Sequence, residues 1–122
     1  MPKNNVPGTS AEEVQVYEAT APLLTAMQIE LKGFAKKKPD ATLSKTKVTF
    51  VNRLLRDLKE LLQNEPNSKY LDLLDDETLP QYSDAVLVVS QYEAALKAFH
   101  NRHTEGEFGE REWVYLPRKK QA

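Results

Sequence analysis

The order of apolar and polar positions along the chain predicts three long helices. Apolar side chains recur at spacings of three and four through residues 10–38, 44–64 and 78–103, and this spacing aligns them along helical faces. Proline or glycine follows each stretch, which is typical of helix ends. The pattern therefore predicts an all-α protein.

The first helix, expected over residues 10–38, carries two apolar faces. Ser10 and Glu13 have the spacing of a capping box and mark its start. Pro22 lies inside the stretch and predicts a kink or two abutting helices, because proline removes a backbone hydrogen bond. Two faces predict two neighbours. The main face consists of Tyr17, Ala21, Leu24, Met27, Leu31 and Phe34, and the second consists of Val16, Ala19, Leu23 and Ala26.

The second helix, expected over residues 44–64, has the clearest amphipathic pattern. Seven aliphatic side chains lie along one side of it, and charged side chains cover much of the remainder. A short helix is expected to follow over residues 69–74. The aliphatic side is formed by Val48, Val51, Leu54, Leu55, Leu58, Leu61 and Leu62.

The last helix is expected over residues 78–103. Thr78 and Gln81 have capping-box spacing, and Pro80 falls in the first turn, where its missing N–H is tolerated. Residues 85–89 (AVLVV) would also suit a buried strand, because β-branched residues favour sheets. The helical spacing continues on both sides of this run and favours the helix.

Together these elements predict an up-and-down bundle of three long helices plus one short helix. Residues 1–9 are expected to form a flexible N-terminus, residues 10–103 the helical domain, and residues 104–122 an irregular C-terminal tail. In such a bundle, the end of the first helix, the start of the second and the end of the last are expected to share one pole.

Composition sets the broad class of the protein. A chain of 122 residues is long enough for one domain with its own core. The absence of cysteine excludes disulfides and favours a cytoplasmic location. The N-terminal sequence lacks the apolar core of a signal peptide, and no apolar run approaches the roughly 20 residues that cross a membrane. We therefore expect a soluble protein without membrane contact.

The net charge is −1, but the charges are distributed unevenly along the chain. Residues 32–59 hold nine Lys or Arg against two acids, and residues 60–84 hold seven acids against one Lys. The bundle is therefore expected to have a basic and an acidic pole. Free N–H groups at the start of the second helix, beside lysines, would form an anion-binding site. Its candidate residues are Lys36, Lys37, Lys38, Lys45 and Lys47.

Nucleic acid is not the favoured ligand of this basic cluster. Aromatic side chains for base stacking are not interleaved with the lysines, and arginine is sparse there. Binding of an anion or of a nucleic-acid backbone is therefore the alternative functional hypothesis.

Signals for catalysis are weaker. His100 and His103, with Glu105 or Glu107, could supply metal ligands for a metal-dependent enzyme, but histidines near a helix C-terminus more often act as caps. Ser44 to Lys47 matches the S-x-x-K pattern without its companion motifs. No motif is specific enough to name a family. We expect no catalytic residues, no metal and no cofactor.

The leading hypothesis is a non-enzymatic protein-interaction module that self-associates. Its partner would be another protein or a second copy of the chain, and its contacts would be the second face of the first helix and the C-terminal tail. The tail residues Trp113, Tyr115 and Leu116 have the composition of an interface. They are expected to dock either on their own bundle or on a partner.

Overall fold

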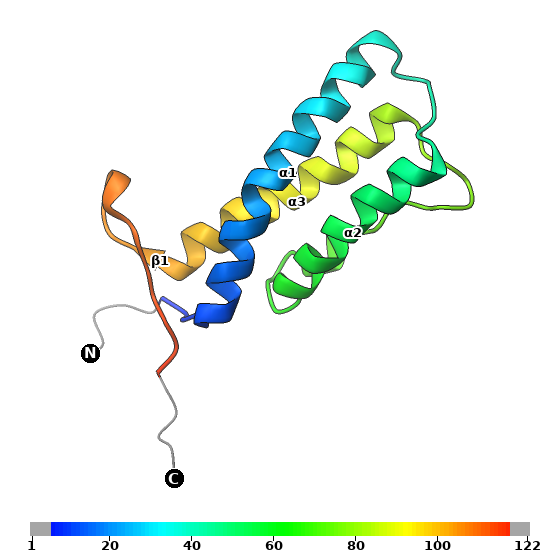
Figure 1. The fold of residues 1–122 in the computed structure, drawn as a ribbon. Coiled ribbons are helices and arrows are strands. Elements are labelled where there is room, and N and C mark those ends of the chain that lie inside the picture. Colours follow the sequence, from blue (N-terminus) through cyan, green and yellow to red (C-terminus); the bar gives the residue numbers. More distant parts are fainter. Residues whose placement is uncertain (1–5, 118–122) are drawn as a thin grey trace.

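Three helices dominate the computed structural model, which describes residues 6–117. The helix α1 packs against both α3 and α2 (Figure 1). The expected all-α bundle of three long helices is confirmed, with a short 3-10 helix and a small hairpin in addition. The elements are α1 (Ala11–Lys37), α2 (Lys45–Leu61), η1 (Ser68–Tyr70), α3 (Tyr82–His103), β1 (Thr104–Glu105), η2 (Phe108–Glu110) and β2 (Glu112–Trp113).

Short polar side chains set the starts of the first two helices. At the start of α1, the Glu13 N–H donates to Ser10 Oγ and the Ser10 N–H donates to Glu13 Oε1, each at 3.0 Å, which is the expected capping box. At the start of α2, Ser44 Oγ accepts from the Lys47 N–H at 3.1 Å. The helix α1 is continuous through Pro22, so the alternative of two abutting helices is wrong.

The helix α3 starts at Tyr82, four residues later than expected. Gln81 is the N-cap residue, and its N–H donates to Asp84 Oδ2 at 3.3 Å. The hydroxyl of Thr78 instead donates to Asp75 Oδ2 at 2.8 Å. This local turn engages the Thr78 side chain, so a later residue caps the helix. The whole AVLVV run is helical, and its interpretation as a strand is wrong.

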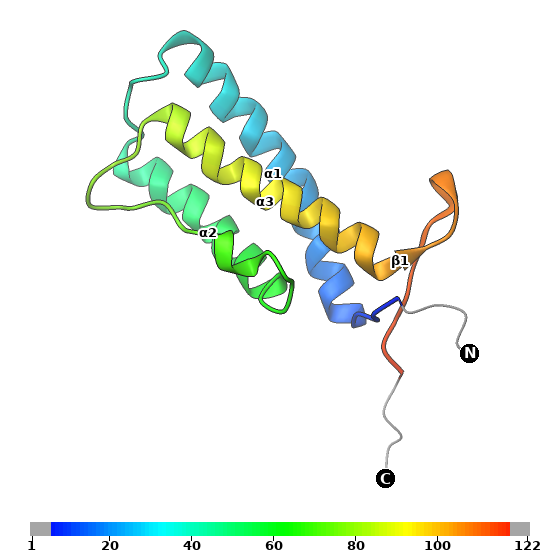
Figure 2. The same ribbon diagram turned by 180° about the vertical axis from the view of Figure 1, so that it is seen from behind.

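The helix α3 runs in the same direction as α2 and opposite to α1 (Figures 1 and 2). Residues 62–81 connect the end of α2 to the start of α3 and run back along the bundle. We call them the return segment. The Leu43 N–H donates to the Pro80 carbonyl, and the Tyr82 N–H donates to the Ala41 carbonyl, each at 2.9 Å. The start of α3 therefore lies where α1 ends and α2 begins. The expectation that the end of the last helix lies at this pole is wrong.

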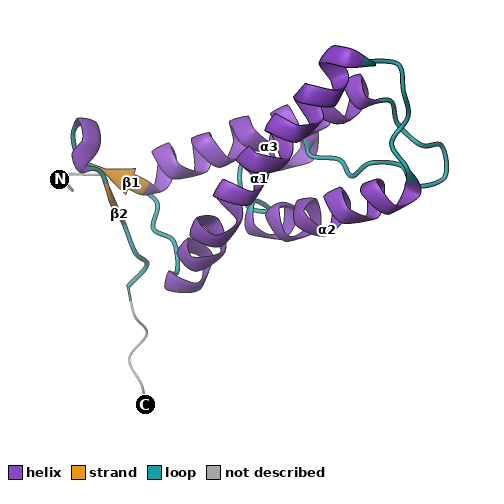
Figure 3. Ribbon diagram, turned by 45° about the horizontal axis from the view of Figure 1, so that its top comes forward, coloured by secondary structure: helices purple, strands orange, loops and turns teal. Residues whose placement is uncertain are grey.

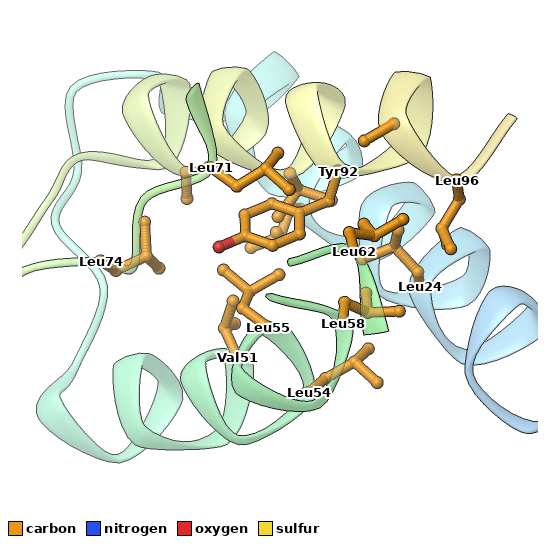
Figure 4. Close-up of a cluster of buried hydrophobic side chains, with 14 of the residues drawn as sticks. Leu24, Val51, Leu54, Leu55, Leu58, Leu62, Leu71, Leu74, Tyr92 and Leu96 are labelled. Carbon is orange, nitrogen blue, oxygen red and sulfur yellow. The ribbon is translucent and has the colours of Figure 1, made fainter. Parts of the chain in front are cut away.

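The return segment is fixed between α2 and α3 by side-chain hydrogen bonds. The Asn52 Nδ2 donates to the Leu74 carbonyl at 2.8 Å, and the Asn52 Oδ1 accepts from the Leu74 N–H at 2.9 Å. The Tyr92 hydroxyl donates to the Asp72 carbonyl at 2.9 Å. The short helix expected over residues 69–74 is a single turn, η1, after which an extended chain places Leu71 and Leu74 in the core (Figure 4).

The two ends of the described chain pair beyond the helices. The Thr9 N–H donates to the Val114 carbonyl, and the Leu116 N–H donates to the Thr9 carbonyl, each at 2.9 Å. Figure 3 shows the hairpin of β1 and β2 at the end of α3. The other residues expected in the flexible N-terminus and in the tail, 1–5 and 118–122, lie outside the described residues.

A cluster of ionisable side chains connects the end of α3 to two other segments, and His103 and Glu65 within it are buried. The His103 Nε2 lies 3.0 Å from Glu65 Oε2, and Arg102 Nη1 lies 3.3 Å from Glu65 Oε1. The His103 Nδ1 lies 2.7 Å from the Pro7 carbonyl oxygen. A carbonyl oxygen can only accept a hydrogen bond, so Nδ1 is the donor of the hydrogen bond to Pro7.

Candidate functional site

An apolar groove of about 800 Å³ lies between α1 and α2. Tyr82, the first residue of α3, lines it where α1 ends and α2 begins. The walls are mostly aliphatic and aromatic, and several of these side chains are exposed to solvent. The α1 wall contains Ala19, Leu23, Ala26, Met27, Glu30 and Phe34, and the α2 wall contains Lys47, Phe50, Val51, Arg53, Leu54 and Asp57.

The α1 wall of the groove includes the second apolar face that the sequence predicted for the first helix. Ala19, Leu23 and Ala26 belong to this face, and all three line the groove. The Leu23 side chain is 58% exposed. Two apolar faces were expected to have two neighbours, and within one chain this face borders an open groove.

The α2 wall presents Phe50, which is 65% exposed. Phe50 lies outside the aliphatic side of α2, so the apolar spacing of the sequence did not indicate it. The feature of the sequence that could have revealed Phe50 is a single large aromatic residue among the charged positions of a strongly amphipathic helix. The Arg53 guanidinium carbon lies 5.6 Å from the centre of the Phe50 ring, within the range of a cation–π contact.

At the Tyr82 end of the groove, a lysine and two aromatic rings form a cluster. The Lys47 Nζ donates to the Tyr82 hydroxyl at 2.7 Å and lies 4.5 Å from the centre of the Phe34 ring. The two rings stack with their centres 5.3 Å apart. Lys47 is therefore positioned by contacts with both α1 and α3, so its charge has a defined place at the groove.

The charged residues of the groove differ between its walls. Glu30 is the charged lining residue from α1, whereas Lys47, Arg53 and Asp57 come from α2. None of these four forms an ion pair with another residue in the range 6–117. The groove therefore carries charges of both signs that are available to a docked partner.

The other lysines of the predicted anion site lie near the groove, at the same pole of the bundle. Lys36 and Lys37 are in the last turn of α1, Lys38 is its C-cap, and Lys45 begins α2. All of them are exposed. The start of α3 with Asp84 also lies at this pole, so an acid is placed where the sequence predicted mainly lysines. Anion binding by this cluster stays a prediction.

The tail residues predicted to form an interface have different environments. Trp113 packs edge-on against Tyr17 and His100, with ring centres 5.0 and 5.1 Å apart, so its ring docks on its own bundle. Tyr115 and Leu116 are exposed. The tail thus leaves two apolar side chains at the surface, far along the chain from the groove residues.

The two histidines considered as metal ligands have separate partners. His100 stacks with Tyr17, whereas His103 is buried against Glu65. Within the part of the chain that the structure describes, no group of three His, Cys, Asp or Glu is arranged to hold a metal ion. None of the described helices is both long enough and apolar enough to cross a membrane.

Comparison with protein-family models, with curated proteins and with solved structures finds no match to this chain.

Proposed function

We propose that the protein is a non-enzymatic interaction module that self-associates by covering the groove between α1 and α2 with a second copy of itself. The observation that supports this proposal is the groove itself, an apolar cleft of about 800 Å³ whose walls expose Leu23, Phe34 and Phe50. Contiguous exposed apolar surface of this kind marks interaction sites, because covering it removes apolar area from water.

The charges of the groove support a second copy as the occupant. Symmetric association requires a surface that is complementary to itself. The groove meets this requirement because one wall contributes Glu30 and the other contributes Lys47 and Arg53. Each copy can offer an acid to the bases of the other. The proposal includes a cytoplasmic location, which the cysteine-free sequence supports.

The experiment compares the molar mass of the wild-type protein with that of two glutamate variants by light scattering across a concentration series. Phe50→Glu places a carboxylate inside the covered groove, where burial of an unpaired charge is costly. Leu87→Glu is the matched control, because Leu87 is 62% exposed on α3 and does not line the groove. We expect dimers for the wild type and Leu87→Glu, and monomers for Phe50→Glu.

Circular dichroism checks that both variants keep their helices. A wild-type protein that stays monomeric throughout the series contradicts the proposal. Dimers of unchanged strength in Phe50→Glu contradict it as well, because the contact would then lie outside the groove.

A further inference from the structure

The geometry points to one arrangement of the dimer: the twofold axis runs along the groove, so that α1 of each copy lies on α2 of the other, and Glu30 of one copy lies between Lys47 and Arg53 of the second. This inference rests on the proposed self-association and specifies its geometry.

Two twofold-symmetric arrangements can place one groove on another with the two grooves aligned. With the axis along the groove, the walls are exchanged, so α1 faces α2 of the second copy at the same height. With the axis across the groove, α1 faces α1 of the second copy and α2 faces α2, and the facing helices run in opposite directions. We call this the crossed arrangement. The charges of the lining residues distinguish the two arrangements.

The relative height of the lining residues follows from contacts within the chain. The Lys47 Nζ lies on the Phe34 ring, so residues 34 and 47 are close in height. Because α1 and α2 run in opposite directions, four residues back along α1 correspond to four residues forward along α2, about 6 Å in each case. Glu30 is therefore level with Val51, which lies between Lys47 and Arg53.

Exchange of the walls consequently sets acids against bases. Glu30 of one copy comes to lie opposite the stretch of α2 that carries Lys47 and Arg53 in the other copy, and the symmetry repeats this contact. Asp57 lies opposite the Leu23 region of α1, where the groove has no charged α1 residue. Both contacts with Glu30 are favourable, and like charges are kept apart.

The crossed arrangement has an unfavourable centre. It would place Lys47 opposite Asp57 of the second copy, which is favourable. However, the midpoint between these two residues is residue 52, so the two Arg53 side chains would start within about 3 Å of each other along the helix axis. Glu30, level with residue 51, would also start within about 3 Å of Glu30 of the second copy along the α1 axis. Two contacts between like charges therefore oppose this arrangement.

Both cations are already oriented before any docking. Lys47 is held by the Phe34 ring and the Tyr82 hydroxyl, and Arg53 lies on the Phe50 ring. Side chains that are ordered in the free protein lose less entropy on binding. The basic half of the contact is thus prepared to receive Glu30.

The experiment uses charge reversal and mixing. Glu30→Arg and Arg53→Glu each create like-charge contacts in the wall-exchanged dimer, and we expect each variant alone to dimerise roughly ten-fold or more weakly than the wild type. When the two variants are mixed, every 30–53 contact joins opposite charges again, so a heterodimer of near wild-type strength is expected. Sedimentation velocity of each variant and of the mixture measures this.

Asp57→Arg is the matched control. It is the same change of charge on the same groove, and the wall-exchanged dimer should tolerate it within about two-fold, since residue 57 faces no charged α1 residue of the second copy before or after the change. A strong loss of dimer in Asp57→Arg, with Glu30→Arg unaffected, overturns the wall-exchanged geometry and supports the crossed one. Absence of recovery on mixing also overturns it.

Cysteine cross-linking provides a second measurement, which reports which residues of the two copies lie close together. The chain has no cysteine of its own. Oxidation of a mixture of Glu30→Cys and Arg53→Cys chains should give a mixed disulfide dimer, whereas a mixture of Lys47→Cys and Asp57→Cys should not. The reverse result overturns the geometry but leaves self-association in place. A monomeric wild type would remove the proposed function itself.

Discussion

The side-chain amide of Asn52 pairs with both backbone polar groups of Leu74, at 2.8 and 2.9 Å. This single residue of α2 therefore holds the return segment in the way that a neighbouring strand would. The contact matters because Leu74 is buried. Its N–H and carbonyl have no access to bulk water and need partners in the protein.

We predict that Asn52→Ala lowers the free energy of unfolding by about 2 to 4 kcal/mol, because two buried backbone groups lose their partners. Asn64→Ala is the control, since Asn64 is exposed after the end of α2 and should change stability by less than about 0.5 kcal/mol. Urea unfolding followed by circular dichroism measures both. An Asn52→Ala protein as stable as Asn64→Ala would show that the return segment is not held in this way.

A second prediction concerns the behaviour at high pH. Burial, together with the charge of Asp72, raises the pKa of Tyr92 to about 12. The folded state therefore favours the neutral phenol. This preference contributes fully to stability below about pH 10, the ordinary pKa of tyrosine, and the contribution is lost as the pH rises towards 12. Alkaline titration of tyrosine absorbance should show one group ionising near pH 12.

That late-ionising group should be missing in Tyr92→Phe. This variant also loses the hydrogen bond to the Asp72 carbonyl, which we expect to cost about 1 kcal/mol near pH 7. Tyr70→Phe is the control because Tyr70 is exposed. If the late ionisation persists in Tyr92→Phe, another tyrosine is responsible.

A third prediction concerns the capping box of α1. Burial raises the pKa of Glu13, but hydrogen bonds from Ser10 and Thr9 and the charge of His103 lower it, so the pKa lies below its ordinary value. The ionised carboxylate thus stabilises the folded state above the ordinary pKa of glutamate, and this contribution is lost as the pH falls through the lowered pKa.

We expect Glu13→Gln to reduce stability at pH 7 by about 0.5 to 2 kcal/mol, the usual value of a helix cap. The difference from the wild type should shrink as the pH falls below about 4, where the wild-type carboxylate also becomes neutral. Glu12→Gln, an exposed first-turn control, should have a smaller effect of about 0.3 to 1 kcal/mol. A pH-independent difference for Glu13→Gln would contradict this role of the charge.

A fourth prediction uses the hairpin that carries Trp113. Gly106 has φ +120°, and a Cβ at this position would lie 2.5 Å from the Glu110 carbonyl oxygen. Gly106→Ala should therefore strain the hairpin by about 1 to 3 kcal/mol. Gly109→Ala is the control, since a Cβ there meets no atom within 4 Å.

The hairpin can be followed through fluorescence, because Trp113 is the single tryptophan of the chain and packs on Tyr17 and His100. We expect Gly106→Ala to shift the emission towards that of a more exposed indole and to lower the midpoint of urea unfolding. An unchanged spectrum and midpoint would show that the hairpin adapts without strain.

The sequence predicted the helices well where apolar spacing was regular. The aliphatic residues from Val48 to Leu62 are all buried, as predicted. The prediction was possible because only a helix places residues at these spacings on one side. The direction of α3 could not be predicted in the same way. It depends on the extended segment after η1, and that segment is held by Asn52 and Tyr92, whose polar atoms act over long sequence separations.

The groove was predicted in part. The second apolar face of α1 indicated one wall, because Ala19, Leu23 and Ala26 recur at helical spacing without serving the main face. Phe50 was missed because one aromatic residue on a polar helix face has no periodicity. The position of Lys47 was also beyond the sequence, since its contact with Tyr82 depends on where α3 begins.

Sedimentation equilibrium of the wild-type protein tests the central claim most directly. Across a concentration series near neutral pH, we expect the average mass to rise from that of one 122-residue chain to twice that value. The same series with Phe50→Glu should stay at the mass of one chain. A wild-type mass that stays at one chain at all concentrations would contradict the conclusion that a second copy covers the groove.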